Sequence, residues 1–553
     1  MKHTASLQRV LRPLATAAAA SLMVACASVG GDRNEAAVNA IDTVVVIYAE
    51  NRAFDTFYGL FPGADGLPGI NPTAAGGYVP QKDFDGAVLP TLPPAWGGLT
   101  ANGQPVTMTQ AQSAGMPNRP FRIDDPAGLN GSGVVVAQSI TTRDLVHRFY
   151  NNIMQIGDGS NDRFAAYSDA GGLSMGYYDG SGMRLWKLAQ EYTLADHFFM
   201  GAFGGSYLNH IYLVCACIPV VPNVDSTPSK ELLSEIEVDA QGRFARLAPA
   251  ANMPQSALSG APRYKNDGAL TPKEPDGSAF TINTMQPPYQ PSGNSPAADG
   301  DIRYADPSRP TTLMPQKLAT IGDRLDAKGV SWAWYGGSWA AASAEPAAAA
   351  ARKLIYRGKV QFQPHHQPFN YFAGFDPQRH QDRRGEHLLD FDARFLADAD
   401  AGKLPHVAFY KPQGNLNQHA GYANVADGDA HIADVIERLK KSPQWPRMLI
   451  VVTYDENGGF YDHVRVPKGD RWGPGSRIPA ILISPLVKKG FVDKTPYDSG
   501  SILRFITRRW SLEPLPGVTM RDDALKANGF APMGDLSGAL QAPGGSGARP
   551  MTD

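Results

Sequence analysis

The fold class of this chain is decided by a stretch near its N-terminus, Thr43–Asn51, which reads TVVVIYAEN. Its first six residues are β-branched or aromatic and uncharged, which is typical of a strand buried on both faces of a sheet. A second stretch of the same character, Met448–Tyr454, runs into Asp455 and Glu456. Strands buried on both faces occur in parallel sheets covered by helices, so these two stretches predict an α/β fold.

Further apolar runs alternate along the chain with segments of helical pattern. The predicted strands are Thr43–Tyr48, Val330–Tyr335, His406–Tyr410, Met448–Tyr454 and Ala480–Ser484. The predicted helices are Met183–Glu191, Tyr207–Cys217, Pro315–Lys328, Gly428–Lys441 and Ser499–Arg509. This alternation predicts a central, mainly parallel sheet flanked by helices.

The first two predicted strands are separated by a segment far longer than a simple crossover requires. We expect one catalytic domain over residues 40–515, with large insertions around 60–130 and 222–310 that form a cap over the sheet edge. Residues 537–553 are rich in Gly, Pro and Ser and are expected to be a disordered tail.

The first 25 residues have the pattern of a signal segment. A basic stretch without acidic residues precedes an apolar run, Leu14–Ala25, which is too short to span a bilayer permanently. Met23–Cys26 resembles a bacterial lipoprotein cleavage box, in which Cys26 becomes the lipidated first residue; Ala25–Ala27 is alternatively an ordinary A-x-A cleavage site. We therefore expect an exported protein, either periplasmic, anchored to the outer membrane through a lipid, or secreted.

The overall composition excludes some functions. At 553 residues, of which 43% are hydrophobic, the chain can bury a large core. Its formal net charge of −2 becomes more negative without the basic N-terminal segment. Such a mildly acidic chain has no electrostatic basis for binding nucleic acid.

Only two cysteines follow Cys26, and a single residue separates them. Because that spacing strains a disulfide, we expect Cys215 and Cys217 to be buried thiols. Cys217-Ile218-Pro219 begins like the sulfatase signature C-x-P-x-R, whose cysteine becomes an aldehyde nucleophile, but Val221 stands where Arg is required. The sequence therefore disfavours sulfatase chemistry.

Acidic residues follow the first and fourth predicted strands directly. Glu50-Asn51 leaves the first strand, and Asp455-Glu456 leaves the fourth. Ligands of open α/β sheets bind at the carboxyl ends of the strands, so these side chains can hold one hard divalent cation between them. The alternative is that such acids cap helices or face solvent.

A Gly-Gly-Ser turn precedes an apolar helix-like segment. Gly204 and Gly205 lead into Ser206, and Ile211–Cys217 follows. The amides and dipole of a helix N-terminus favour an anion, either a serine alkoxide or a phosphate. Ser206 is thus a candidate nucleophile; the alternative is an ordinary N-cap.

Histidine is scarce, with 12 in the chain, yet four histidines lie in polar, turn-rich surroundings. They are His147, His365, His366 and His419. Imidazoles in such settings can donate to phosphate oxygens or protonate a leaving group. The alternative is that each is a surface or core histidine.

Taken together, five motifs resemble the bacterial acid phosphatase and phospholipase C family, of the alkaline-phosphatase-like superfamily. The motifs are Glu50-Asn51-Arg52-Ala53-Phe54-Asp55, Gly204-Gly205-Ser206, His365-His366, Asn417-Gln418-His419 and Tyr454-Asp455-Glu456-Asn457-Gly458-Gly459-Phe460-Tyr461-Asp462-His463. The resemblance implies the alkaline-phosphatase-like fold and a phosphoserine intermediate. It implies the following metal ligands: Glu50, Asn51, Ser206, Asp455 and Glu456. It also implies Ser206 as nucleophile, and phosphate contacts or leaving-group acids at Asn51, His147, His365, His366 and His419.

The sequence favours the phosphomonoesterase branch of that family. It lacks the twin-arginine pair common in the phospholipase branch, and it stops soon after Trp510 without that branch's additional C-terminal modules. We expect an exported acid phosphatase that uses one divalent metal of unknown identity on small phosphate esters. A phospholipase C-type phosphodiesterase that acts on phospholipid head groups is the main alternative, and a non-catalytic surface-binding lipoprotein is the second.

Overall fold

The structure is a computed structural model that describes residues 34–290, 296–301, 303–344 and 361–541. The expected signal segment 1–25 and Cys26 lie outside the described residues. Nearly all buried apolar side chains belong to one continuous core. In the described part of the chain, no helix combines the length and apolar character needed to cross a membrane.

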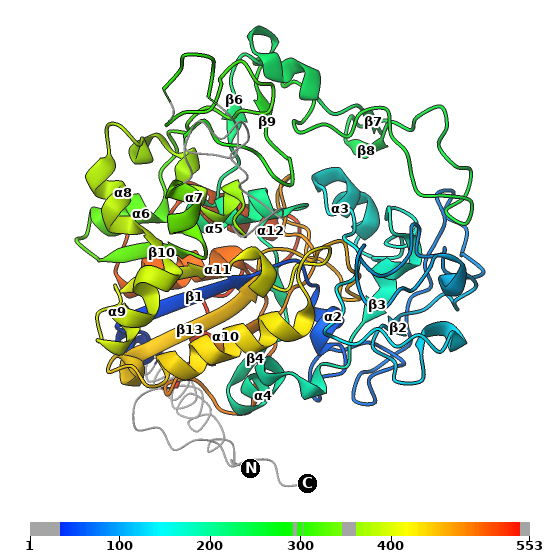
Figure 1. Cartoon of the computed structure of the whole chain (residues 1–553), viewed down its shortest axis with the longest axis horizontal. Coiled ribbons are helices and arrows are strands. Elements are labelled where there is room, and N and C mark those ends of the chain that lie inside the picture. The colour runs from blue at the N-terminus through cyan, green and yellow to red at the C-terminus, as the bar shows by residue number, and fades with distance from the viewer. Residues whose placement is uncertain (1–33, 291–295, 302, 345–360, 542–553) are drawn as a thin grey trace, which may run out of the picture.

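The core is organised around an eight-stranded sheet (Figure 1). In spatial order its strands are β11 (Leu388–Asp390), β10 (Trp332–Gly336), β12 (Val407–Lys411), β1 (Thr43–Ala49), β13 (Met448–Tyr454), β14 (Ala480–Ile483), β4 (Thr193–Ala195) and β15 (Phe491–Asp493). Seven strands run in one direction, and β14 is antiparallel to both of its neighbours. The predicted α/β fold with a mainly parallel sheet is confirmed.

Helices cover both faces of this sheet (Figure 1). One face carries α4 (Arg184–Glu191), α9 (Leu396–Asp400) and α10 (Val425–Leu439), and the other carries α5 (Ser206–Cys215) and α11 (Ser499–Arg509). The Tyr410 hydroxyl of β12 lies 2.6 Å from His431 of α10, whereas the Tyr48 hydroxyl of β1 donates to the Asn209 carbonyl of α5. Every residue of β1 and β13 is buried, because helices cover both of their faces.

The remaining helices and strands lie outside the central sheet and its two main helix layers. The helices are α2 (Phe54–Tyr58), α3 (Phe149–Ile156), α6 (Ile321–Asp326), α7 (Trp339–Ala344), α8 (Gln381–His387) and α12 (Pro516–Ala527). Four two-stranded sheets pair β2 (Phe121–Arg122) with β3 (Gly176–Tyr177), β5 (Phe198–Phe199) with β16 (Tyr497–Asp498), β6 (Val220–Val221) with β9 (Ala279–Phe280), and β7 (Ile236–Val238) with β8 (Phe244–Leu247). Most of β6 to β9 and the loops between them belong to the insertion around 222–310, at the top of Figure 1.

All five predicted strands and all five predicted helices have a counterpart in the structure. The helix expected over Pro315–Lys328 is shorter, because it begins only after Thr320, whose side chain forms a capping box with Asp323. Three strands of the central sheet were not predicted, namely β4, β11 and β15. Each has only three residues, too few to show a pattern in the sequence.

The prediction of two free thiols at Cys215 and Cys217 is wrong, since a disulfide joins them. Helix α5 ends at Cys215, and Ala216 adopts a left-handed backbone with φ 47°. This turn brings the two Cα atoms to 5.1 Å, a usual separation for a disulfide.

The folded domain extends beyond the predicted limits of 40–515. Helix α12 packs against α11, and its Arg521 is fully buried. The Arg521 guanidinium binds Asp470 at 2.8 Å and Asp498 at 3.1 Å. These buried ion pairs attach α12 to the core.

The first residues of the tail expected over 537–553 are folded. Ser537–Ala539 forms a 3₁₀ helix whose two end residues are buried, and Leu540 forms a β-bridge with Val487. These contacts hold the segment against the core, and the rest of the expected tail, from residue 542, lies outside the described residues.

Candidate active site

Strands β1 and β13 deliver their acidic residues side by side. The two strands pair in parallel with Ala49 opposite Tyr454, so Glu50 and Asp455 leave the sheet together. The backbone N–H of Asn51 donates to Asp455 Oδ1 at 3.0 Å. The register of the sheet therefore creates the acidic centre predicted from the strand ends.

The glycine pair after Glu456 allows three segments to meet. Gly458 and Gly459 both have positive φ, and a Cβ on Gly458 would lie 2.4 Å from the Asn51 carbonyl oxygen. A Cβ on Gly459 would lie 2.5 Å from the carbonyl oxygen of Val146, the residue before His147. Any side chain at either position would push the loop away from the acidic centre.

Ser206 is the first residue of α5 and is buried beside the strand ends. Its Oγ lies 3.3 Å from Asn51 Oδ1 and 3.3 Å from Glu456 Oε1. The first-turn amides of the helix favour negative charge at this position. Ser206 thus lies where an alkoxide or a bound anion is stabilised and a carboxylate can accept its proton.

Two neighbouring carboxyl groups, those of Asp455 and Glu456, face Ser206. Burial raises the pKa of Asp455 to about 7, and the negative charge of Glu50 adds to the shift. Burial also raises the pKa of Glu456 well above its usual range, although His147 opposes the shift. Like charges at this spacing disfavour joint ionisation unless a cation lies between them.

Glu50 differs, because it is surrounded by donors. Its Oε1 lies 2.8 Å from Lys411 Nζ and 2.6 Å from His366 Nε2, and its Oε2 accepts from Asn417 and Tyr422 at 2.7 and 2.6 Å. Burial alone would raise its pKa, but Lys411 and His366 hold the pKa of Glu50 well below its usual range. Glu50 is therefore an ionised carboxylate.

His147 and His419 approach Asn51 from opposite loops, with their ring centroids 5.6 Å apart. The Nε2 atom of His419 lies 2.8 Å from Asn51 Nδ2, and that of His147 lies 3.4 Å away. Burial lowers the pKa of His419 to about 4. Burial would also lower the pKa of His147, but Glu456 and Asp144 raise it to about 9. His147 is thus the cationic imidazole of this pair at neutral pH.

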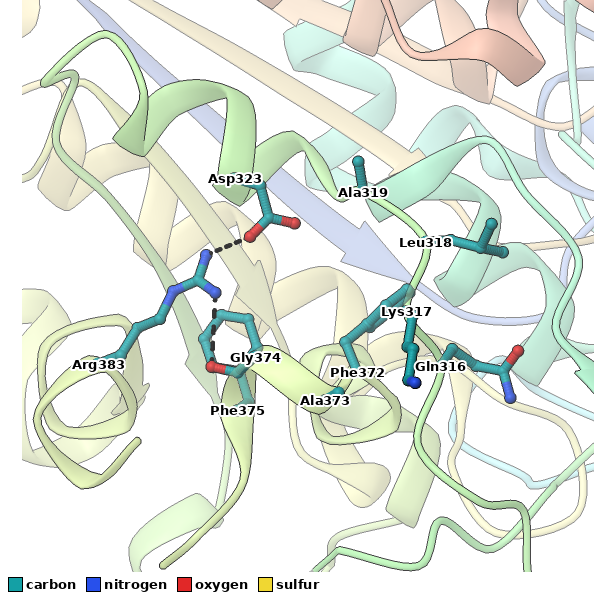
Figure 2. Close-up of a pocket in the computed structure, with 10 residues that line it drawn as sticks. All are labelled: Gln316, Lys317, Leu318, Ala319, Asp323, Phe372, Ala373, Gly374, Phe375 and Arg383. Carbon is teal, nitrogen blue, oxygen red and sulfur yellow. Dashed lines mark hydrogen bonds and ion pairs between the residues drawn. The ribbon is translucent and has the colours of Figure 1, made fainter. Parts of the chain in front are cut away.

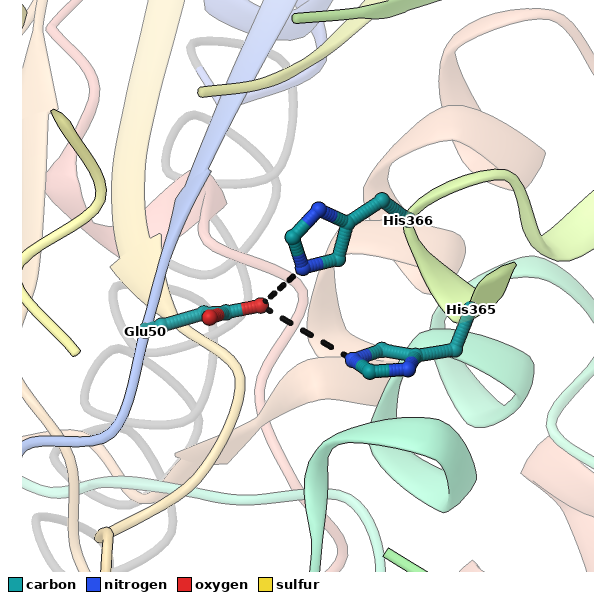
Figure 3. A group of neighbouring side chains, drawn as sticks. All are labelled: Glu50, His365 and His366. Atoms are coloured by element: carbon teal, nitrogen blue, oxygen red, sulfur yellow. Dashed lines mark hydrogen bonds and ion pairs between the residues drawn. The ribbon is translucent and has the colours of Figure 1, made fainter. Parts of the chain in front are cut away.

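His365 and His366 both face the carboxylate of Glu50, as Figure 3 shows. His366 Nε2 contacts Glu50 Oε1, and His365 Nε2 lies 3.9 Å from the same oxygen. Neither ring nitrogen of His365 has a hydrogen-bond partner among the residues described. Burial lowers the pKa of both histidines, so both are neutral imidazoles.

The structure brings all nine predicted residues into one network of contacts. Further members that were not predicted include His210, Lys411, Asn417 and Tyr422. His210 Nδ1 donates to the Ser206 carbonyl at 2.7 Å, and that nitrogen lies 3.8 Å from Asp455 Oδ2. Its position four residues after Ser206, on the same helix face, is a signal that the sequence offered.

A pocket of about 780 Å³ opens onto this network. Its lining includes Ser206, His147, His365 and His419, together with Asn283, Thr284 and Met285 from the 222–310 insertion. That insertion therefore forms part of the wall through which a substrate would reach Ser206.

A smaller pocket of about 340 Å³ lies elsewhere, between α6 and the loop around Phe372–Phe375 (Figure 2). Among the charged side chains that line it, Arg383 donates to Asp323 at 2.6 Å and lies over the Phe375 ring. None of the predicted site residues lines this second pocket.

The residues around Ser206 fit a divalent cation. Asp455 Oδ2 is buried and has no hydrogen-bond partner within the described ranges, which is costly for a carboxylate oxygen. Glu50, His210 and Asp455 offer ligand atoms within 4.8 Å of one another, as do Glu50, His365 and His366. The donor set of carboxylates, an amide, a hydroxyl and imidazoles suits a divalent metal ion.

The protein has an α/β fold in which Ser206, at the N-terminus of α5, lies beside buried carboxylates that fit a divalent cation. The profile of the Phosphoesterase family matches residues 41–513, and the chain belongs to this family.

Curated relatives are phospholipases C. Phospholipase C B of Mycobacterium tuberculosis is 22% identical over 88% of this chain and 76% of its own length. Non-specific phospholipase C6 of Arabidopsis thaliana is 33% identical over 23% of this chain, and the match spans only 30% of that relative. Non-hemolytic phospholipase C of Pseudomonas aeruginosa is 28% identical over 21% of this chain and 22% of its own length.

Overall likeness to solved structures is low. A crystal structure of a protein in the alkaline phosphatase superfamily from Vibrio parahaemolyticus has a TM-score of 0.28 and 11% identity, covering 68% of this chain and 67% of that one. The PsFucS1 sulfatase from Pseudoalteromonas sp. has a TM-score of 0.30 and 12% identity, covering 66% and 67%. The family assignment stands on the sequence match.

Proposed function

We propose that this protein is an exported acid phosphatase that hydrolyses phosphomonoesters through a phosphoserine on Ser206, with one divalent metal ion. One observation carries the proposal. Ser206 Oγ lies 3.3 Å from both Asn51 Oδ1 and Glu456 Oε1, at the start of α5 and in the wall of the pocket of about 780 Å³.

The metal would be held by Asn51, Ser206, Asp455 and Glu456, with Glu50 beside them. A bound divalent cation supplies positive charge that favours the serine alkoxide and the phosphate oxygens. Glu456 lies close enough to Ser206 Oγ to accept its proton. The amides of the first turn of α5 stabilise the negative charge that develops.

The covalent step is an in-line displacement at phosphorus. The Ser206 Oγ–P bond forms while the P–O bond to the alcohol breaks, and the departing alkoxide takes a proton from His147, the cationic imidazole of the site. Water then attacks the phosphoserine and gives a proton to His147, while the P–Oγ bond breaks, phosphate is released and Ser206 takes its proton back from Glu456. His147 is the cationic group placed to bind the phosphate oxygens, and His419 and Asn51 orient one another.

The pocket lining supports a small polar ester. Asp144, Arg148, Asn283 and Gln363 line it together with the histidines. Tyr422 is its single tyrosine, and none of the lining residues in the described part of the chain is Trp or Phe. A quaternary ammonium head group is usually bound by a cage of such aromatic rings.

The second candidate is a phospholipase C-type phosphodiesterase, which would use the same nucleophile. Similarity to phospholipases C over most of the chain favours it. The deciding assay compares p-nitrophenyl phosphate with p-nitrophenyl phosphorylcholine, with and without a chelator. We expect chelator-sensitive turnover that is faster on the monoester. Faster turnover of the diester would replace the first candidate by the second, and no turnover of either would favour a binding role.

Export and lipid anchoring are part of the proposal, on the basis of the apolar Leu14–Ala25 run and Cys26. In a bacterial host, Cys26→Ser should move the protein from the membrane fraction to a soluble one. A wild-type protein that is already soluble and begins at Ser28 would instead support ordinary signal cleavage.

A further inference from the structure

Lys411, at the end of β12, carries its charge into the centre of the protein. Its side chain is 0% exposed, and it is the one lysine among the buried residues of the described ranges. Its Nζ lies 2.8 Å from Glu50 Oε1 and donates to the Tyr48 carbonyl at 3.1 Å. Parallel pairing of β12 with β1 fixes this approach, because Tyr410 lies opposite Ile47.

The fold does not require the Lys411–Glu50 ion pair. The segments of β1 and β12 that precede it are apolar and fully buried, so an apolar pair would continue the same packing. Taking two charges out of water offsets most of their mutual attraction, and apolar replacements often stabilise a fold equally well. The pair therefore points to a role in the site.

The position of Lys411 coincides with a second set of metal-type ligands. Glu50, His365 and His366 place a carboxylate oxygen and two Nε2 atoms around one point (Figure 3). Two imidazoles and one carboxylate form a ligand set that zinc adopts. The ammonium of Lys411 already lies against the same Glu50 oxygen, and its charge repels a cation placed there.

The carboxylate oxygens of Glu50 are also fully occupied by hydrogen-bond donors. A carboxylate offers about four lone-pair positions, and Lys411, His366, Asn417 and Tyr422 each occupy one. Asp455 contrasts with it, because Asp455 Oδ2 has no such partner in the described residues. The open side of the acidic centre is thus the Asp455 side, and the Glu50 side is filled by an internal cation.

We propose that Lys411 is a positioning residue that fixes Glu50 and takes the electrostatic place of a second divalent cation at the Glu50–His365–His366 group. The centre then holds a single metal, on the side of Asp455 and Glu456. This inference rests on the proposed metal-dependent function, and it explains how three buried carboxylates are matched by one metal ion.

The test counts metal ions, with Zn²⁺ as the probe. Apo protein is titrated with Zn²⁺, and bound metal per chain is measured for wild type, Lys411→Met and Lys411→Met/His365→Ala. We expect wild type to saturate at one ion. Lys411→Met keeps the length of the side chain and removes its charge. It should take up a second ion, with an affinity at least tenfold above any binding of a second ion to wild type. The added His365→Ala change should abolish that second ion.

An equal metal count in folded Lys411→Met and wild type would overturn the role of Lys411 while leaving the proposed function intact. A wild-type chain that binds no Zn²⁺ would instead overturn the metal-dependent function, and this inference with it. The wild-type titration needs no variant to fold: saturation at two ions of similar affinity would by itself contradict the inference.

Discussion

Two buried acidic clusters lie at the two ends of the segment 455–463, and they differ in how their carboxylates are paired. The first, the catalytic cluster, contains Glu50, Asp455, Glu456 and Ser206. The second, the Arg477 cluster, contains Asp55, Asp462, His463 and Arg477. By distance alone, a metal ion could be held by Asp55, Asp462 and His463 of the second cluster, or by Glu50 and Asp455 of the first together with His210.

In the Arg477 cluster, the guanidinium of Arg477 forms ion pairs with the carboxylates. The fully buried guanidinium binds Asp462 through Nε at 2.9 Å and Asp55 through Nη2 at 3.0 Å, and its Nη1 donates to the carbonyls of Asp65 and Asp196. His463 Nδ1 lies 2.7 Å from Asp55 Oδ2. In the catalytic cluster, by contrast, Asp455 Oδ2 has no hydrogen-bond partner among the described residues.

The two clusters differ in whether they leave a carboxylate oxygen available to a further cation. A cluster whose carboxylates are all paired supports the fold, whereas one that leaves ligand atoms open has a site for a further cation. The Arg477 cluster also joins the segments that follow Asn51 and Glu456, so it holds the metal-type ligands in position. The two clusters should therefore respond to mutation in opposite ways.

The largest effect should come from Ser206→Ala. Loss of the nucleophile should reduce kcat by at least about a thousandfold, with little change in the free energy of unfolding. Steady-state kinetics and denaturant unfolding measure the two quantities. The control is Ser499→Ala, at the start of α11, which should keep wild-type turnover. Retention of about a tenth of the wild-type kcat by Ser206→Ala would exclude it as the nucleophile.

Arg477→Met should have the opposite effect, on stability. It leaves Asp55 and Asp462 buried without their cation, which costs about 3–5 kcal/mol of the free energy of unfolding. Urea unfolding checks the value, with Arg438→Met as control, because the Arg438–Asp400 pair is exposed. An unchanged urea midpoint for Arg477→Met would show that the cluster does not support the fold.

His419→Ala tests the phosphate side of the catalytic cluster. We expect kcat/KM to fall about a hundredfold with the metal content unchanged, since His419 contacts Asn51 and no carboxylate of the acidic centre. His431→Ala, a histidine of α10 outside the site, is the control. Loss of metal in His419→Ala would instead make His419 part of the metal site.

His463 should give the Arg477 cluster a pH-dependent stability. Burial would lower its pKa, but Asp55 and Asp65 raise the pKa of His463 to about 9. A raised pKa stabilises the fold fully below the unfolded value near 6.5, and the contribution is lost as pH rises through about 9. Compared with wild type, His463→Gln should be less stable by about 1–3 kcal/mol at pH 6, with the gap narrowing toward pH 9.5. A gap that is independent of pH would contradict the ion pair.

Much of this arrangement could be predicted from the sequence, and the failures have physical causes. Glu50 and Asp455 follow directly from apolar strands, so the topology of a parallel sheet places them together. The histidines come from distant loops, and only the family resemblance joined them to the site. Lys411 ends a strand, a place where a lysine normally points into solvent, and nothing in the sequence reveals that this one is buried.

The fold shows the same limit. The strand Ala480–Ser484 was predicted, but its direction depends on the path of the chain between strands, which periodicity does not encode. The disulfide was missed because it depends on the left-handed backbone of Ala216, a conformation that alanine rarely adopts.

The most direct test of the account is metal content after matched substitutions in the two clusters. Asp455→Asn and Asp462→Asn each replace one buried carboxylate by an amide of the same shape. Purified proteins would be dialysed against metal-free buffer and measured by elemental analysis. The account predicts about one divalent ion per chain in wild type and in Asp462→Asn, and a metal content near zero in Asp455→Asn. Full metal content in Asp455→Asn, or its loss in Asp462→Asn alone, would contradict the assignment of the metal to the catalytic cluster.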